Sequence, residues 1–116
     1  MTRVSDSRFE QLAAEALDGL PDWVRERMDN VEVVVEPGPP PGEPDLLGQY
    51  HGIPLTKRGS GYAGVTPDTI SLYRSTIERA SMSEDDLRER VKHVIAHEVG
   101  HFFGISDERL REIGRY

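Results

Sequence analysis

Cysteine is absent from the 116 residues of this chain. Its absence excludes a disulfide scaffold and thiolate metal ligands, so any zinc ion must be held by nitrogen and oxygen atoms. A chain without cysteine also fits a reducing compartment, and we expect a cytoplasmic protein. Long apolar runs are lacking as well: none approaches the ~20 residues that span a membrane, and Met1–Ser7 lack the apolar core of a signal peptide. We therefore expect no membrane association.

Basic residues are few. The chain has 14 Lys and Arg against 21 Asp and Glu, which gives a net charge of −7 at pH 7. Nucleic-acid phosphates would be repelled by such a chain unless it carried a concentrated basic stripe. The densest basic stretch, Arg88–Lys92, is interrupted by Glu89 and has the pattern of a solvated helix face. The sequence therefore predicts no nucleic-acid partner.

The length and the 36% hydrophobic content suit one domain with a modest core. We expect this single domain to cover residues 1–116, with residues 1–6 as a disordered tail. Apolar residues at helical spacing predict a first helix that is capped within Ser5–Ser7 and ends at Gly19. Pro21 suits the first turn of a second short helix reaching Met28.

The middle of the chain predicts strands and loops. Val31–Glu36 is short and β-branched, which indicates a strand. Residues 37–44 contain five prolines and predict a stiff, extended surface loop; a docking ligand for a proline-binding domain is the alternative. Leu46–Gly52 predicts a second strand. Lys57–Gly61 predicts a loop, because it lacks the strand, helix and spacing of a phosphate-binding loop.

The last part of the chain predicts a strand and two helices. Thr69–Ile77 alternates well enough for a third strand. Ser83, with Asp86 three residues later, predicts the capped start of a long helix that reaches about residue 103. Ser106 would cap a last short helix containing Leu110 and Ile113. This order of helices, strands and helices predicts an α+β fold.

The long helix carries the pattern H-E-x-x-H-x-x-G-x-x-D, from His97 to Asp107. Residues four apart lie on one face of a helix, so His97 and His101 can converge on one zinc ion at roughly 2.0–2.1 Å per bond. Glu98 lies about 100° round the helix from His97, where it is badly aimed as a ligand but can touch a metal-bound water. We interpret it as a general base.

Gly104 can adopt the left-handed conformation that ends a helix. The chain would then turn back, and Asp107 would offer the third ligand, leaving a fourth position open as in catalytic zinc sites. Glu108 is a competitor for this role, but the spacing from Gly104 favours Asp107. The alternative without a metal is two solvated histidines and an acid at the start of the next helix.

His93, His97 and His101 form one stripe along the helix. His93 and His101 are eight residues apart, or about 12 Å of helical rise, which is at or beyond the span of two imidazoles. We therefore expect His93 to be a neighbour of the site rather than a ligand. His51 could reach the site only through the fold.

The motif resembles that of the zincin metallopeptidases, in particular the branch whose third ligand is an Asp. The chain is also similar to the small bacterial zincin-like domains described as minimal zincins, over about residues 8–114. The similarity lies in the following segments: Ala16–Pro21, Asn30–Val33, Leu46–Gly48, Gly52–Leu55, Pro67–Tyr73 and His97–Leu110.

This resemblance implies a short mixed sheet packed against the N-terminal helices and the long active-site helix, with a short C-terminal helix. It implies one Zn²⁺ ion bound by His97, His101 and Asp107, with Glu98 as base, and a peptide substrate that pairs with a sheet edge. Larger zincins with this long motif usually have a Met-containing turn beneath the metal, whereas no Met follows Asp107 in this sequence. Tyr116 is our candidate to fill that space.

The resemblance favours a zinc metallopeptidase that cleaves peptide bonds by means of an activated water. Two alternatives stay open. One is a metal-binding or catalytically silent zincin-like domain that acts in protein interaction, and the other is a metal-dependent hydrolase of a non-peptide amide. The expected partner is a peptide or protein substrate, and the sequence is compatible with a monomer or a homodimer.

Overall fold

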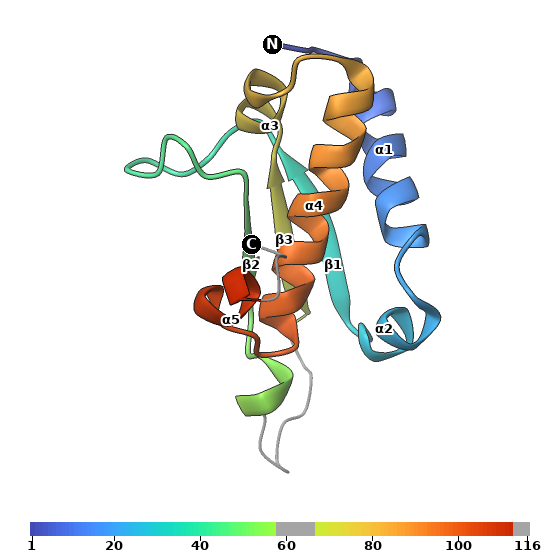
Figure 1. Ribbon diagram of the computed structural model, residues 1–116, viewed down its shortest axis with the longest axis vertical. Coiled ribbons are helices and arrows are strands. Elements are labelled where there is room, and N and C mark those ends of the chain that lie inside the picture. The colour runs from blue at the N-terminus through green and yellow to red at the C-terminus, as the bar shows by residue number, and fades with distance from the viewer. Residues whose placement is uncertain (58–66, 113–116) are drawn as a thin grey trace.

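The computed structural model describes residues 1–57 and 67–112 and shows an α+β fold, as the sequence predicts (Figure 1). The first half contains helices α1 (Asp6–Asp18) and α2 (Asp22–Arg27), strands β1 (Val31–Glu36) and β2 (Gly48–His51), and a 3₁₀ turn at Leu55–Lys57. The second half contains strand β3 (Asp68–Tyr73) and helices α3 (Arg74–Ala80), α4 (Glu84–Phe102) and α5 (Asp107–Glu112). None of the described helices is long and apolar enough to cross a membrane.

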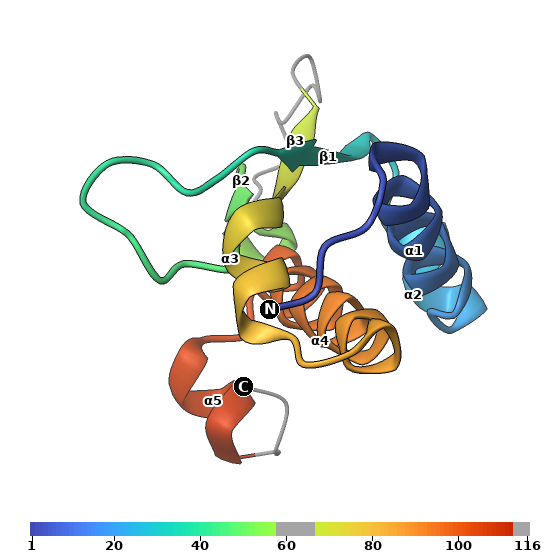
Figure 2. The ribbon, with the colours of Figure 1, turned by 90° about the horizontal axis from the view of Figure 1, so that it is seen from above.

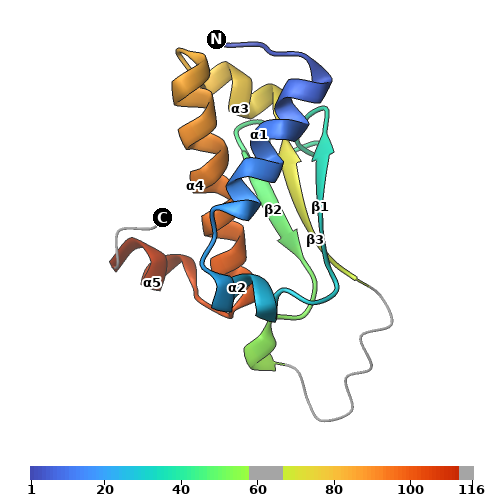
Figure 3. The same ribbon diagram turned by 90° about the vertical axis from the view of Figure 1, so that its right-hand side faces the viewer.

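The three described strands form one mixed sheet in the order β1-β3-β2. β1 pairs with β3 in parallel, from Val31 opposite Asp68 to Glu36 opposite Tyr73. β2 pairs with β3 in antiparallel orientation, with Gly48 opposite Leu72. α1 and α4 lie on the same face of this sheet (Figures 2 and 3). The mixed sheet covered by a long helix confirms the predicted arrangement, and it leaves β2 as an edge strand beside α4.

The core lies between α1, α4 and the covered face of the sheet. Its largest fully buried hydrophobic residues are Phe9, Leu12, Ile70, Leu72, Ile77, Leu87, Val91, Ile95 and Phe102. Within α4 the buried positions 87, 91 and 95 recur every four residues and therefore share one face. Each large side chain that is fully buried stabilises the fold by about 1.5–3 kcal/mol, and this packing holds α4 in place above the strands.

Polar groups cap α4 at its predicted start. The Ser83 hydroxyl accepts a hydrogen bond from the Asp86 backbone N–H at 3.0 Å, and the Asp86 carboxylate accepts one from the Met82 backbone N–H at 2.8 Å. The hydrogen bond from Met82 holds the pKa of Asp86 below its usual value. The cap therefore fixes both the first turn of α4 and the position of Asp86.

Two sequence predictions were wrong. The third strand was expected to cover residues 69–77, but β3 ends at Tyr73 and α3 begins at Arg74. Arg74 and Glu78 are four residues apart and form an ion pair of 3.2 Å, and Ile77 is fully buried, so the helix both pairs its charges and joins the core. The alternating pattern of this segment did not distinguish a strand from this short helix.

The second error concerns residues 1–6, which were expected to be a disordered tail. The Thr2 N–H donates to the backbone carbonyl of Glu78 at 3.0 Å, and the Val4 N–H donates to the Glu78 carboxylate at 3.0 Å. Asp6 already belongs to α1. Because Glu78 is only 6% exposed, its carboxylate needs hydrogen-bond donors, and the N-terminal segment supplies one of them.

Residues 37–44 contain no helix or strand and form part of a long loop that extends away from the sheet and helices (Figure 2). The predicted loop at Lys57–Gly61 lies largely outside the described residues, although Lys57 itself ends the 3₁₀ turn.

Candidate metal centre

The motif residues meet at the point where α4 ends and the chain reverses. α4 stops at Phe102, and Gly104 follows with φ of 86°, the left-handed conformation predicted for it. The Gly104 N–H donates to the His101 carbonyl and the Ile105 N–H donates to the Gly100 carbonyl, both at 2.9 Å. These two bonds form a Schellman turn, which sends the chain back beside the last turn of the helix. Asp107 then starts α5 on the same side as the histidines.

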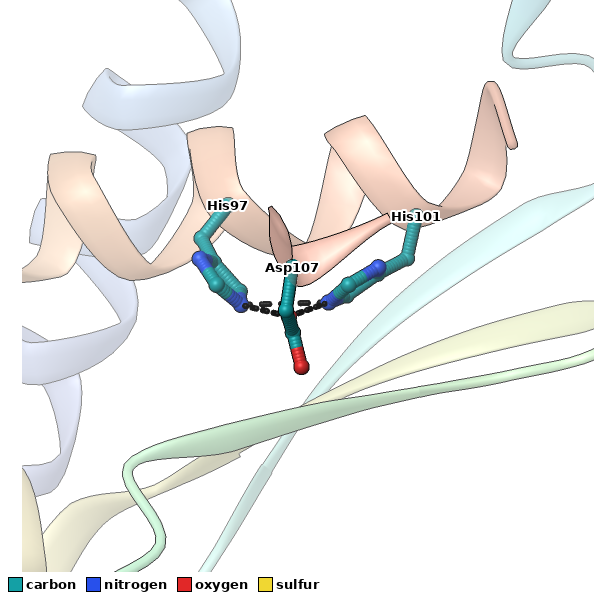
Figure 4. Close-up of side chains that lie close together, drawn as sticks. All are labelled: His97, His101 and Asp107. Carbon is teal, nitrogen blue, oxygen red and sulfur yellow. Dashed lines mark hydrogen bonds and ion pairs between the residues drawn. The ribbon is translucent and has the colours of Figure 1, made fainter. Parts of the chain in front are cut away.

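His97, His101 and Asp107 bring one nitrogen or oxygen atom each to a common point (Figure 4). His97 Nε2 lies 3.1 Å from His101 Nε2. Asp107 Oδ1 lies 3.4 Å from His97 Nε2 and 2.9 Å from His101 Nε2. Two ligands bound to one tetrahedral zinc ion at roughly 2.0–2.1 Å are about 3.3 Å apart. The three separations therefore suit one face of a zinc coordination tetrahedron.

The protonation pattern of His101 also suits a metal ligand. Its Nδ1 lies 3.0 Å from the carbonyl oxygen of Ile105, and a carbonyl can only accept, so Nδ1 carries the proton. In the neutral form of the ring, Nε2 then has the lone pair that a metal ion at the common point would take. Hydrogen bonds of this kind fix the ring orientation of metal-bound histidines and increase their basicity. Two imidazoles and one carboxylate form a donor set that zinc accepts.

Glu98 lies beside this group rather than within it. Its Oε2 atom is 3.9 Å from His97 Nε2, and the residue is only 6% exposed. Burial raises the pKa of the Glu98 carboxyl group, and the charge of Asp107 adds to this effect. His101 and a hydrogen bond from the Tyr50 backbone N–H act in the opposite direction. A carboxylate with a raised pKa is a stronger base, which suits a group that takes a proton from water.

Strand β2 approaches Glu98 through its outer edge. The Leu47 carbonyl accepts the Tyr73 N–H, so the alternation of an antiparallel pair turns the backbone groups of Gly48 and Tyr50 away from β3. This direction explains how the Tyr50 N–H reaches Glu98. Gly48 lies so close to α4 that a Cβ there would be 2.6 Å from Val94 Cγ1. The absence of a side chain at Gly48 thus lets β2 and α4 come together at the site.

A family model described as zincin-like metallopeptidase matches residues 28–115. The chain belongs to this zincin-like metallopeptidase family. The matched segment contains the whole sheet, α4 and the group formed by His97, His101 and Asp107. Membership confirms the resemblance read from the sequence and implies zinc binding in general. No protein with a curated description matches the chain.

A solved structure shares the fold. It is a conserved hypothetical protein from Thermus thermophilus, with a TM-score of 0.61 and 20% sequence identity. The alignment covers 97% of this chain and 100% of that one. At this identity the likeness concerns the fold alone.

The other candidate residues of this zincin-like chain lie apart from the metal group. Among the described residues, the atoms within 4.8 Å of one another come from His97, His101 and Asp107, and neither His93 nor Glu108 belongs to that set. His93 instead lies on the wall of a cleft beside the group. His51 is exposed at the end of β2. Tyr116 is outside the described residues.

Three groups near the site were not found from the sequence. They are the Ile105 carbonyl that orients His101, the Tyr50 N–H that contacts Glu98, and the side chain of Arg90, which lines the same cleft as His93. The first two are backbone groups and carry no residue signal. Arg90 precedes Glu98 by eight residues, and this helical spacing could have placed it on the same side of α4.

Proposed function

We propose that this chain is a zinc-dependent metallopeptidase in which Glu98 is the general base. The observation that carries the proposal is the triangle of His97, His101 and Asp107 atoms, with separations of 2.9–3.4 Å, next to a buried carboxylate. A bound zinc ion in such a site lowers the pKa of a water molecule towards ~7 and polarises a substrate carbonyl.

The residues of the chain divide the remaining tasks. His97, His101 and Asp107 hold the ion, and the Ile105 carbonyl keeps the His101 ring in its binding orientation. Glu98 accepts a proton from the attacking water and delivers it to the nitrogen of the leaving amine. The Tyr50 N–H donates a hydrogen bond to the Glu98 carboxylate, whose Oε2 atom lies 3.9 Å from His97 Nε2.

The substrate binds as an extended peptide along the outer edge of β2, in our proposal. The backbone groups of Gly48 point away from β3, and β2 lies directly beside Glu98. An added strand would gain main-chain hydrogen bonds from this edge and would bring its carbonyl groups past the catalytic residues. The side chain of Asp107 is 53% exposed, so the group is accessible from solvent.

The test compares zinc content, by mass spectrometry of the metal, with hydrolysis of a mixture of peptides. Glu98→Gln is expected to keep zinc and lose turnover, because the amide cannot accept the proton. His97→Ala is expected to lose zinc and activity together. Equal activity in wild type and Glu98→Gln would refute the role of Glu98. Stoichiometric zinc without hydrolysis of any peptide would favour the silent interaction domain instead.

A further inference from the structure

A cleft of about 330 Å³ continues from the metal group along α4. One wall is the segment 45–48, which leads into β2, and the other is the face of α4 that carries Arg90, Val94 and Glu98. A peptide paired with β2 would therefore run directly along this cleft. Leu46, Leu47 and Val94 make much of the wall apolar, whereas Arg90 places a cationic group at the end away from the metal.

Arg90 is only loosely held by its neighbour on the helix. Its Nη2 lies 3.4 Å from each oxygen of Asp86, whereas strong hydrogen bonds between such charged groups are about 2.7–2.9 Å long. Asp86 cannot move closer without leaving the cap, because it already accepts the Met82 N–H at 2.8 Å. Within the described residues, the buried Nε of Arg90 has no hydrogen-bond partner. The Arg90 side chain is 33% exposed, and its weak contact with Asp86 can give way to a closer pair with an incoming anionic oxygen.

The two carboxylates that line the cleft, those of Asp45 and Glu98, lie away from Arg90. Asp45 at the mouth is 3.3 Å from Arg79, and its side chain is 95% exposed, so its charge is directed towards solvent. Glu98 lies at the opposite end, beside the metal group. His93 is exposed on the α4 wall, next to Arg90. An apolar wall with one loosely paired arginine suits a chain segment that carries a single carboxylate.

The spacing along α4 indicates where this carboxylate lies in the substrate. Arg90 and Glu98 are eight residues apart, which corresponds to about 12 Å of helical rise. An extended peptide advances about 3.3 Å per residue, so the carboxylate belongs about three to four residues from the bond that is cleaved. It is either an acidic side chain or the C-terminal carboxylate of the peptide.

We infer that this cleft is a substrate subsite for a peptide carboxylate, with Arg90 as its binding residue. The inference rests on the proposed peptidase function for the orientation of the peptide, but the subsite can be tested by binding alone. The probes are short fluorescein-labelled peptides of alanine and leucine with one central Glu or Gln, each with a free or an amidated C-terminus. Anisotropy titrations use the zinc-loaded Glu98→Gln protein, which is expected not to cleave them.

We expect that removal of the recognised carboxylate weakens binding about tenfold, as for the loss of a charge-assisted hydrogen-bonded pair. If the side chain is recognised, the Gln peptides bind more weakly; if the C-terminus is recognised, the amidated peptides do. In the Arg90→Gln variant this difference is expected to fall below about twofold. Arg90→Lys keeps the charge but not the planar fork, and should retain part of it.

Arg88→Gln is the matched control. Arg88 lies on the same helix but pairs with Glu15 and Asp85, outside the cleft, and the variant should bind all four peptides as the parent does. Thermal melts of each variant show whether the fold is retained, and Arg90→Lys carries the test if Arg90→Gln is unstable. Equal binding of the four peptides by the parent protein, or a carboxylate preference that survives Arg90→Gln, would overturn the inference.

Cleavage by the wild-type protein is measured separately on the same peptides. Binding that depends on Arg90 without any cleavage would leave the subsite in place and refute the peptidase proposal. Cleavage that ignores the carboxylate would support the peptidase and refute the subsite.

Discussion

Replacing Gly104 by alanine should damage both the stability of the fold and the metal centre. Gly104 has φ of 86°, and a non-glycine residue held in the left-handed region costs about 1–2 kcal/mol. A Cβ at this position would also lie 2.2 Å from Thr56 Oγ1 and 3.0 Å from Thr56 Cβ. Thr56 is exposed and can shift, so the collision adds about 1 kcal/mol, at the low end of the cost of overpacking.

The free energy of unfolding of Gly104→Ala should therefore fall by about 2–3 kcal/mol. Urea denaturation with a chelator present measures this change without a contribution from bound metal. Gly42→Ala is the matched control, because Gly42 has φ of 89° and nothing lies within 4 Å of the added Cβ. The free energy of unfolding of the control should fall by the cost of backbone strain alone. The double variant Gly104→Ala with Thr56→Ala should recover part of the further loss that Gly104→Ala shows relative to this control.

Zinc affinity is the second readout of the same variant. Gly104 lies between His101 and Asp107, so a shift of the turn would move the proposed third ligand, Asp107, and the Ile105 carbonyl that orients His101. Loss of such supporting contacts typically weakens metal binding by about 10–100-fold, which chelator competition can measure. If Gly104→Ala matches Gly42→Ala in both stability and zinc affinity, the role assigned to this turn is wrong.

The other predictions concern packing, pH and metal binding. Gly48→Ala should lower the free energy of unfolding by about 1–3 kcal/mol in urea denaturation because of the contacts with Val94 and the Ser71 carbonyl. Gly19→Ala, whose added Cβ would have only ordinary contacts, should be nearly neutral, and equal effects would refute this account. Burial raises the pKa of Glu98 in the folded state above its value in the unfolded chain, so this group contributes stability below the unfolded-state pKa that is lost as the pH rises through the folded-state pKa. Metal-free Glu98→Gln should thus melt higher than wild type at pH 7 and not at pH 4; a wild type that melts higher at pH 7 would contradict this reasoning. Zinc at a hundredfold excess over its dissociation constant adds about 2.7 kcal/mol of stability, and this gain should vanish in Asp107→Ala but persist in His93→Ala.

Local signals made much of the fold predictable. The Ser83 cap and the apolar spacing define α4, and Val31–Glu36 became β1 with the predicted bounds. The placement of Gly104 could also be predicted, because the left-handed turn depends on one residue and its immediate neighbours. The prediction of a strand at Thr69–Ile77 was wrong in its second half. The alternating pattern suits a strand, but Ile77 is buried as part of helix α3, and that burial depends on the rest of the core.

The candidate site divides in the same way. His97, His101 and Asp107 come from one continuous stretch, so helical geometry and one turn were enough to bring them together. The contact between Glu98 and the Tyr50 N–H joins α4 to a strand nearly fifty residues earlier in the chain. The sequence pattern of neither segment predicts this contact. From the sequence, Arg90 was interpreted as part of a solvated helix face. Its cleft forms only when the segment 45–48 lies beside α4, and the sequence of α4 does not reveal this neighbour.

The short stretch that carries the metal group has a consequence for folding. All three candidate ligand atoms lie within residues 97–107, so a bound ion would crosslink only a small loop at one end of α4. Closing a loop of this length reduces the conformational entropy of the unfolded chain only slightly. A metal ion bound there would also not join the helix to the sheet. The layered core, whose residues run from Phe9 to Val99, must then hold the domain together without help from the ion. We expect the metal-free chain to fold, with zinc chiefly ordering the turn into α5 rather than nucleating the domain.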